Sequence, residues 1–522
     1  MMILVSGTIF TLLNLSFLVF TILIKLIFRD YYNLLLTDNS LLKYEDLLHS
    51  IISEAQKYNV DYAEARFHST QHLAAILQNG ESKPTISYEK QGIGIRMIYE
   101  GVMVFASTNM FDNSLTELIE NTISRAKSSI KISKSPIKFS EEKSIKKNWS
   151  AIEKENLKNV HVNDMISVLN EVDNYITSYD SDVSLTNRSL GLDNSIEEKF
   201  YVNTDDTQIL SRVPRVSFHS LITAKYEGQL SAFSIPAGYA GLGKSGGWEI
   251  IETFDLSNYI PEQLNVSSNS IKAKSEKFAG DVDVVVGPDI AGLVAHESCG
   301  HPFEADRILG REAAQAGESY LDFDCIGTRI GSDEVYVSDD PTLPQSMGFY
   351  LYDDEGIESK KRELINAGVI TDLLHNRETS SKMNIHSNAA SRSVEFDKEP
   401  IIRMSNTFIE PGNFELDELL SDIKNGVYIK NFMEWNIDDR RENQRYVGFE
   451  AYKIINGELD THVKSPVLEL TSKKFWSSVD ARSRNLDFKA ANCGKGEPMQ
   501  GAPVWTGAPD VRLRNLRVGT RS

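Results

Sequence analysis

The chain is poor in cysteine and has no excess of positive charge. It carries three cysteines in 522 residues, Cys299, Cys325 and Cys493, and a sparse, odd set does not make a disulfide framework. A reducing, cytoplasmic compartment is therefore expected. Lysine and arginine number 55 against 74 aspartates and glutamates, so the formal net charge is −19. This balance argues against a nucleic-acid-binding protein, because phosphates need a basic surface.

Charged residues are also missing from one long run near the start, Ile3 to Ile24. Such a run is long enough to span a bilayer, and no basic segment precedes it as in a signal peptide. Lys25 and Arg29 follow it, so insertion would leave the rest of the chain in the cytoplasm. Residues 1–39 are thus expected to be an N-terminal membrane anchor or the product of a mis-assigned gene start.

The remaining pattern predicts an α+β protein without internal repeats. Helical periodicity at Leu41–Tyr58 and after Ser114, with strand-like runs between them, predicts an N-terminal α+β domain at 40–132, with an antiparallel sheet and flanking helices. A lysine- and serine-rich linker is expected at 133–160, followed by a central α+β region at 161–276. A mostly β C-terminal domain is expected at 277–522.

The most informative stretch is His296-Glu-Ser-Cys-Gly-His301. Imidazoles are good zinc ligands, and an acid beside the first one is placed to act as a general base. However, residues i and i+5 lie about 140° apart on an α-helix and cannot share a face. A π-type turn would bring both histidines together. We therefore expect a helix from about Pro288 to His301 with an irregular last turn.

A zinc site of this kind needs a third protein ligand. Cys493 stands between small residues near the end of the chain, and with the two histidines it would leave one position open, as in catalytic zinc sites. Glu304 and Asp306 compete for the same role, and spacing alone leaves all three open. A further glycine-rich stretch, Gly238–Gly247, is a weak phosphate-loop signal and is better interpreted as a loop over the active site.

Several segments together resemble the TldD/PmbA family of zinc metallopeptidases over roughly residues 41–518. They are Val284–Pro288 leading into His296–His301, Phe303–Asp306, Asp353–Gly356, Leu364–Val369, Arg403–Thr407 with Glu410–Gly412, Gly426–Tyr428, Glu450–Tyr452 and Cys493–Lys495. Pro302-Phe303 departs from the glycine–apolar pair expected at that point, whereas no departure is seen at the ligands.

The resemblance implies one Zn²⁺ per chain, held by His296, His301 and Cys493, with Glu297 as the catalytic acid. It also implies the motif-bearing, TldD-like subunit, which works as a homodimer or as a heterodimer with a motif-less, PmbA/TldE-like paralogue. The substrates would be unfolded or short peptides, bound as an added β-strand.

The expected activity is hydrolysis of peptides by a metal-activated water, with Glu297 as general base. Arg392, Tyr350 and Tyr446 are candidate oxyanion or substrate donors, although ordinary polar packing is the more common role of such residues. The alternative is a non-catalytic regulatory or binding subunit of the same type of complex.

Overall fold

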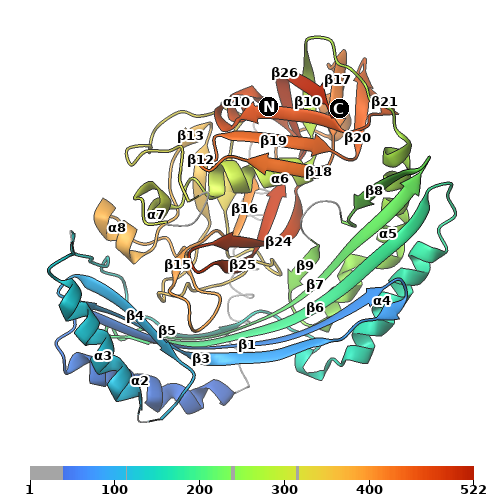
Figure 1. Ribbon diagram of the computed structural model, residues 1–522. Coiled ribbons are helices and arrows are strands. Elements are labelled where there is room, and N and C mark those ends of the chain that lie inside the picture. The colour runs from blue at the N-terminus through green and yellow to red at the C-terminus, as the bar shows by residue number, and fades with distance from the viewer. Residues whose placement is uncertain (1–38, 113, 134, 237–240, 313–316, 522) are drawn as a thin grey trace, which may run out of the picture.

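The computed structural model of the protein describes residues 39–112, 114–133, 135–236, 241–312 and 317–521. The fold is α+β: a long curved sheet lies beneath a C-terminal part built mostly of short strands (Figure 1). The uncharged run at residues 3–24 lies outside the described residues. Within them, no helix has the length and apolar character needed to cross a membrane.

The long sheet is made by strands from both the N-terminal and the central parts of the chain. Its strand order is β4-β3-β1-β6-β7-β5, and all of these pairs are antiparallel except β5 with β7. The strands are β1 (Tyr62–Gln78), β3 (Ile86–Tyr99), β4 (Val102–Thr108), β5 (Lys146–Ser150), β6 (Ser184–Asn203) and β7 (Gln208–Tyr226), with the short β2 (Glu81–Ser82), β8 (Gln229–Phe233) and β9 (Leu242–Ser245) alongside.

Three details of this sheet differ from the sequence pattern. Two of the strand-like runs in the sequence, Ala63–Phe67 and Leu73–Leu77, belong to one continuous strand, because the polar residues between them pair with β3 and β6 on both sides. Residues 133–160, expected as a linker, contain β5. Since β1 pairs with both β3 and β6, one sheet spans the N-terminal and central regions; the domain boundaries themselves stay predictions.

Amphipathic helices cover two parts of this sheet. The helices α2 (Glu45–Gln56) and α3 (Ser114–Ser129) pack with Phe67 and Ile95 in one core, as their periodicity predicts. The helices α4 (Val162–Thr177) and α5 (Leu256–Lys272) pack with Leu192 and Phe218 in another. Short 3₁₀ segments lie at Asn39–Tyr44 (η1), Leu157–Asn159 (η2) and Trp248–Phe254 (η3).

The C-terminal part contains two further mixed sheets and a two-stranded ladder. The first has the order β18-β19-β22-β26-β10-β17-β20-β21, with β23 paired to β26, and the second has the order β13-β12-β11-β16-β25-β24. The strands of the first are β10 (Asp281–Val286), β17 (Asn425–Ile429), β18 (Phe432–Ile437), β19 (Asn443–Gly448), β20 (Ala451–Ile455), β21 (Glu458–His462), β22 (Pro466–Thr471), β23 (Val479–Arg482) and β26 (Val511–Thr520). Those of the second are β11 (Val337–Asp339), β12 (Arg362–Asn366), β13 (Val369–Ile370), β16 (Asn406–Ile409), β24 (Asp487–Lys495) and β25 (Gln500–Ala508), while β14 (Ser391–Arg392) pairs with β15 (Ile401–Ile402).

The helix α6 (Pro288–Ala295) connects these two sheets. It follows β10 of the first sheet directly and packs against β25 and β16 of the second. The close approach depends on Gly292, where an added Cβ would lie 3.0 Å from the backbone N of Gly507. The other C-terminal helices are short: α7 (Ala305–Ile308), α8 (Arg377–Met383), α9 (Leu416–Leu420) and α10 (Ser472–Ser478).

Buried and partly buried ion pairs join the long sheet to the C-terminal part. Arg96 on β3 contacts Glu64 on β1 at 3.0 Å and Glu355 at 2.7 Å, and Lys199 on β6 contacts Asp354 at 2.9 Å. Glu355 and Asp354 belong to the Asp353–Gly356 segment, which forms a turn in which Gly356 adopts φ 77°. This turn therefore fixes the position of the C-terminal part over the sheet.

We expect Gly292→Ala to destabilise the protein, because the neighbouring atoms are backbone and cannot rotate away. Overpacking of this kind costs about 1–3 kcal/mol, and denaturant unfolding would measure it. The matched control is Gly501→Ala, since a Cβ there has nothing within 4 Å. Equal stability of the two variants would show that α6 does not depend on this contact.

Acid should also destabilise the protein through His68 on β1. This histidine is buried, and its Nε2 lies 3.2 Å from Oε1 of Glu197. Burial, with help from Lys199, lowers the pKa of His68 to about 4. An unfolded histidine has a pKa near 6.5, so the unfolded chain binds more protons and stability falls as pH drops from about 6.5 to 4. The loss from this group is on the order of 2 kcal/mol between pH 7 and 4.5.

Unfolding free energies of the wild type and His68→Gln over that pH range provide the measurement. The dependence on pH should be shallower in the variant, whereas His49→Gln, a change at an exposed histidine on α2, should leave it as in the wild type. If the unfolding free energy of His68→Gln fell with pH as steeply as that of the wild type, His68 would not be a source of the acid sensitivity.

Candidate metal centre

The two motif histidines come together because the helix changes from α-type to π-type hydrogen bonding at the end of α6. Residues His296–Gly300 form a π-type turn (η4), and the backbone N–H of His301 donates to the carbonyl of His296 at 3.0 Å. This i→i+5 bond adds one residue to the turn, so the two imidazoles share a side. Their ring centroids lie 4.9 Å apart. The irregular last turn predicted from the spacing is therefore confirmed.

Cys493 reaches the same point from β24, far along the chain. Its Sγ lies 3.2 Å from Nε2 of His301. Ligand atoms of His296, His301 and Cys493 all lie within 4.8 Å of one another, and the three residues are buried. The strand is held by β25, which pairs Cys493 with Ala502, and by Arg403, whose guanidinium donates to the carbonyl of Cys493.

The surroundings favour a thiolate at Cys493. Burial alone would raise the pKa of the thiol, but His301, His296 and Arg403 together hold it well below its usual value. Burial lowers the pKa of His296. At His301, the opposing influence of Cys493 and Glu304 outweighs burial and raises the pKa.

Glu304 contacts His301 on the side of the imidazole ring that faces away from Cys493. One carboxylate oxygen of Glu304 lies 3.2 Å from Nδ1 of His301, 2.5 Å from Nε of Arg307 and 3.3 Å from Nζ of Lys495. A carboxylate fixes the proton on Nδ1, which leaves Nε2 to face Cys493. Although burial would raise the pKa of Glu304, Lys495 and Arg307 hold it well below its usual range.

The competing third ligands are thus engaged elsewhere. Glu304 binds the outer nitrogen of His301 and two cations, and Asp306 accepts from Lys495 at 2.7 Å. Of the three candidates that the spacing left open, Cys493 is the one in the cluster with the histidines.

Glu297 lies within the π-type turn and is buried, in an ion pair with Nη1 of Arg441. Sequence reasoning missed Arg441. It lies in the polar stretch Asp438–Glu442 between β18 and β19, and nothing in its local pattern distinguishes it from a surface turn residue. Sequence reasoning also missed the supporting roles of Arg307 and Lys495.

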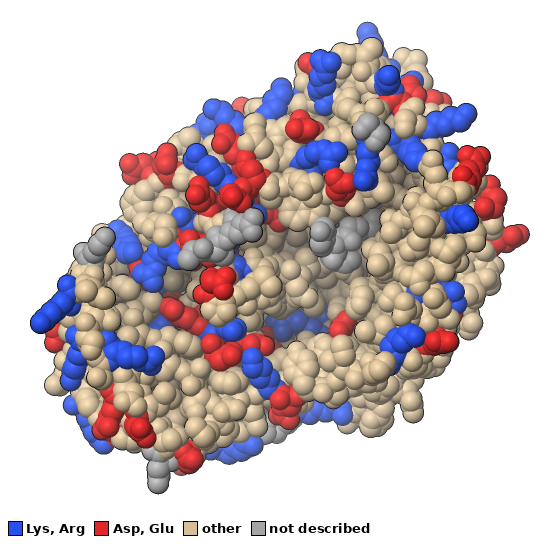
Figure 2. All heavy atoms as spheres, viewed as in Figure 1, with Lys and Arg blue, Asp and Glu red and all other residues tan. Residues whose placement is uncertain are grey.

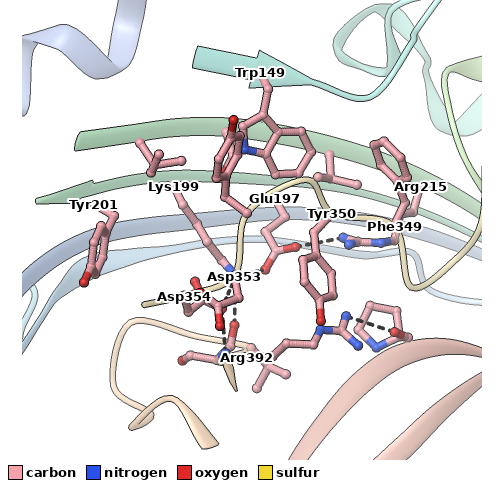
Figure 3. Close-up of a pocket in the computed structure, with 17 residues that line it drawn as sticks. Trp149, Glu197, Lys199, Tyr201, Arg215, Phe349, Tyr350, Asp353, Asp354 and Arg392 are labelled. Carbon is pink, nitrogen blue, oxygen red and sulfur yellow. Dashed lines mark hydrogen bonds and ion pairs between the residues drawn. The ribbon is translucent and has the colours of Figure 1, made fainter. Parts of the chain in front are cut away.

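The three candidate oxyanion donors are used in local packing. Tyr446 donates to Gln444 at 2.7 Å. Tyr350 donates to the carbonyl of Ala389 at 2.8 Å, and Arg392 to the carbonyls of Met404 and Pro503. Figure 3 shows Tyr350 and Arg392 beside Arg215 and Glu197 in a separate cavity of about 40 Å³, whose lining does not include the histidines or Cys493.

A larger cleft of about 690 Å³ lies between the long sheet and β24. Figure 2 shows this face of the molecule hollowed between the two parts. Its floor carries polar side chains of β1, β6 and β7, such as His72, Asp193 and His219, and its other wall includes Ala491 and Asn492, next to Cys493.

The described part of the glycine-rich stretch, residues 241–247, begins beside this wall. Residues 237–240 lie outside the described residues, but Gly241 forms an antiparallel bridge with Ala490 of β24. Gly241 therefore lies beside the strand that carries Cys493, whereas the interpretation of the stretch as a loop over the active site stays a prediction.

Three family models match the chain in order. Models described as PmbA/TldA metallopeptidase domain 1, central domain and C-terminal domain match residues 63–130, 155–269 and 279–520. The chain belongs to the TldD/PmbA metallopeptidase family. The resemblance stated from the sequence is thereby confirmed.

Relatives from archaea match over almost their whole length. A Methanocaldococcus jannaschii protein named a metalloprotease is 28% identical and covers 87% of this chain and 96% of its own. A Saccharolobus solfataricus protein named a zinc metalloprotease TldD homologue is 25% identical, and the match covers 90% of this chain and 98% of that protein. The crystal structure of TldE from Thermococcus kodakarensis, 16% identical, covers 91% of this chain and 100% of its own with a TM-score of 0.66, which shows a shared fold.

The donor set in this TldD/PmbA chain fits a zinc ion. Two neutral imidazoles and one thiolate are ligands that zinc prefers, and three protein ligands are the usual number at a catalytic zinc. Nδ1 of His296 is buried and makes no hydrogen bond within the described residues.

We expect Cys493→Ser to lower the zinc content of the purified protein sharply, because a neutral hydroxyl replaces a thiolate ligand. Metal analysis would measure it. Cys325→Ser is the matched control, since Cys325 is a buried cysteine that is not part of the cluster. Unchanged zinc in Cys493→Ser would remove Cys493 from the ligand set.

Proposed function

We propose that the chain is a zinc-dependent peptidase that hydrolyses unfolded or short peptides, with one Zn²⁺ per chain. The observation that carries the proposal is the convergence of His296, His301 and Cys493 within 4.8 Å, with Glu297 in the same turn of helix. The metalloprotease names of the archaeal relatives support the same class of activity.

When bound, zinc would act as a Lewis acid for the scissile carbonyl and lower the pKa of a water molecule. Glu297 accepts the proton of the attacking water and returns it to the leaving amine. His301 is kept in the correct tautomer by Glu304, and burial of the cluster excludes bulk water, which strengthens each electrostatic contact.

The cleft beside β24 supports a peptide substrate. Within the described strands, β24 is the last of its sheet, so beyond the bridge to Gly241 its outer edge is free to pair with another chain. An extended peptide would bind there through backbone hydrogen bonds, which read little of the sequence. Folded proteins would be excluded because their backbone groups are already paired.

The fold shared with TldE suggests the partner. We propose that the chain works as a homodimer or with a motif-less, PmbA/TldE-like paralogue. Light scattering on the chain alone and mixed with such a paralogue would distinguish these assemblies. A monomer under both conditions would contradict the proposal.

A regulatory subunit that has kept its ligands is the second candidate. The buried pairing of Glu297 with Arg441 is compatible with it, but the set of three ligands does not favour a structural role, because structural zinc is usually closed by four protein ligands. A protein that contains zinc but cleaves no peptide, even when the paralogue is present, would favour the regulatory subunit.

We expect Glu297→Gln to retain about one zinc per chain and to lose peptide hydrolysis, because the amide cannot accept the proton. Loss of a general base typically costs about 10²–10⁴-fold in rate. Cleavage of a mixture of short peptides and of an unfolded protein, with and without a chelator, would measure it. Glu458→Gln, at an exposed position on β21, is the control; normal turnover in Glu297→Gln would reject the assignment of the base.

A further inference from the structure

Arg441 occupies an unusual position for a charged residue. It lies between β18 and β19 with φ 61°, the left-handed region that L residues rarely adopt. Its side chain is 9% exposed, whereas the neighbouring Arg440 is exposed. A turn that needed only this backbone conformation would favour glycine or asparagine. The backbone conformation alone therefore does not explain an arginine here, and the contacts of its side chain have to be considered.

The backbone around Arg441 is held firmly. The carboxylate of Asp438 accepts hydrogen bonds from the backbone N–H groups of Glu442 at 2.8 Å and Asn443 at 3.1 Å. The N–H of Arg441 donates to the carbonyl of Asp438 at 3.0 Å, and the carbonyl of Arg441 accepts from Ser472 at 2.8 Å. The hairpin thus aims the guanidinium at a fixed point.

That point is the carboxylate of Glu297. Nη1 of Arg441 contacts Oε2 of Glu297, the one carboxylate that Arg441 binds within the described part of the chain. Nε of Arg441 is buried and makes no hydrogen bond there. By contrast Glu304, the other buried carboxylate beside the cluster, is shared by Arg307, Lys495 and His301.

We propose that Arg441 is a positioning residue for Glu297: it holds one carboxylate oxygen in place and leaves the other oxygen to meet the attacking water. This inference rests on the proposed peptidase function. A carboxylate on a side chain with three rotatable bonds needs such an anchor, because a misplacement of about 1 Å can cost roughly 100-fold in rate. Arg441 lies 144 positions after Glu297 in the sequence, so a distant hairpin supplies this anchor.

The test compares Arg441→Gly, Arg441→Lys and the matched control Arg440→Gly in the full chain. Arg441→Gly removes the guanidinium and also relieves the left-handed backbone, so loss of function would not reflect a strained turn. Lysine keeps the charge but not the planar fork. Zinc per chain, thermal midpoint, kcat and KM would be measured for each, with and without added guanidinium chloride at millimolar concentration.

In Arg441→Gly we expect zinc to stay near one per chain, kcat to fall about 100-fold and KM to change less than about threefold. Arg441→Lys should recover part of kcat, and free guanidinium should restore part of it in Arg441→Gly but not in Glu297→Gln. Arg440→Gly should match the wild type. A kcat within twofold of the wild type in Arg441→Gly would overturn the proposal, as would a loss that neither lysine nor guanidinium reverses.

A double-mutant cycle in zinc-free protein gives a readout that does not depend on activity. Arg441→Gly should lower the thermal midpoint in the wild-type background, where it leaves Glu297 buried without its partner, and lower it much less in Glu297→Gln. Equal shifts in both backgrounds would mean that the two side chains are not coupled. If the wild type itself cleaves no peptide while this coupling is present, the peptidase function fails and the pairing stands.

Discussion

The structure around the candidate metal centre depends on one backbone hydrogen bond, from the N–H of His301 to the carbonyl five residues earlier. A regular α-helix would turn one imidazole of the pair away. With the extra residue in the turn, both histidines face Cys493, and Gly300 lets the turn pack against Met404, which a Cβ would displace. Geometry that is unfavourable in an isolated helix is thus stabilised by tertiary packing around it.

The rest of the fold serves to bring a late strand to that turn. α6 starts directly after β10 and lies on β25, and β25 in turn holds β24 in register. The long sheet contributes no residue to the His–His–Cys cluster. It forms the floor of the cleft and is joined to the C-terminal part by the ion pairs of Arg96 with Glu355 and of Lys199 with Asp354. The His–His–Cys cluster and the floor of the cleft therefore come from different parts of the chain, and these ion pairs fix how the two parts are placed.

Residue spacing and hydrophobic periodicity predicted several elements of this fold. The spacing of His296 and His301 predicted the π-type turn, because sharing an ion imposes a geometric requirement on the helix. Amphipathic periodicity predicted α2 and α3. The single strand β1 reads as two shorter runs in the sequence, because the polar residues at its middle are paired with β3 and β6, which are distant in sequence. Arg441 could not be predicted, because its pairing with Glu297 depends on how two sheets pack. The same holds for the choice of Cys493 over Glu304, which spacing left open.

Cys493 and His301 are separated by 192 positions in the chain, and this separation gives a bound ion a second consequence. An ion held by both residues closes a very long loop, as a cross-link does, and so restricts the unfolded chain. A ligand that binds only the native arrangement also shifts the folding equilibrium by mass action. Loading the centre would therefore couple the integrity of the last strands to metal supply, so that the same ion would govern both the chemistry of the chain and its lifetime.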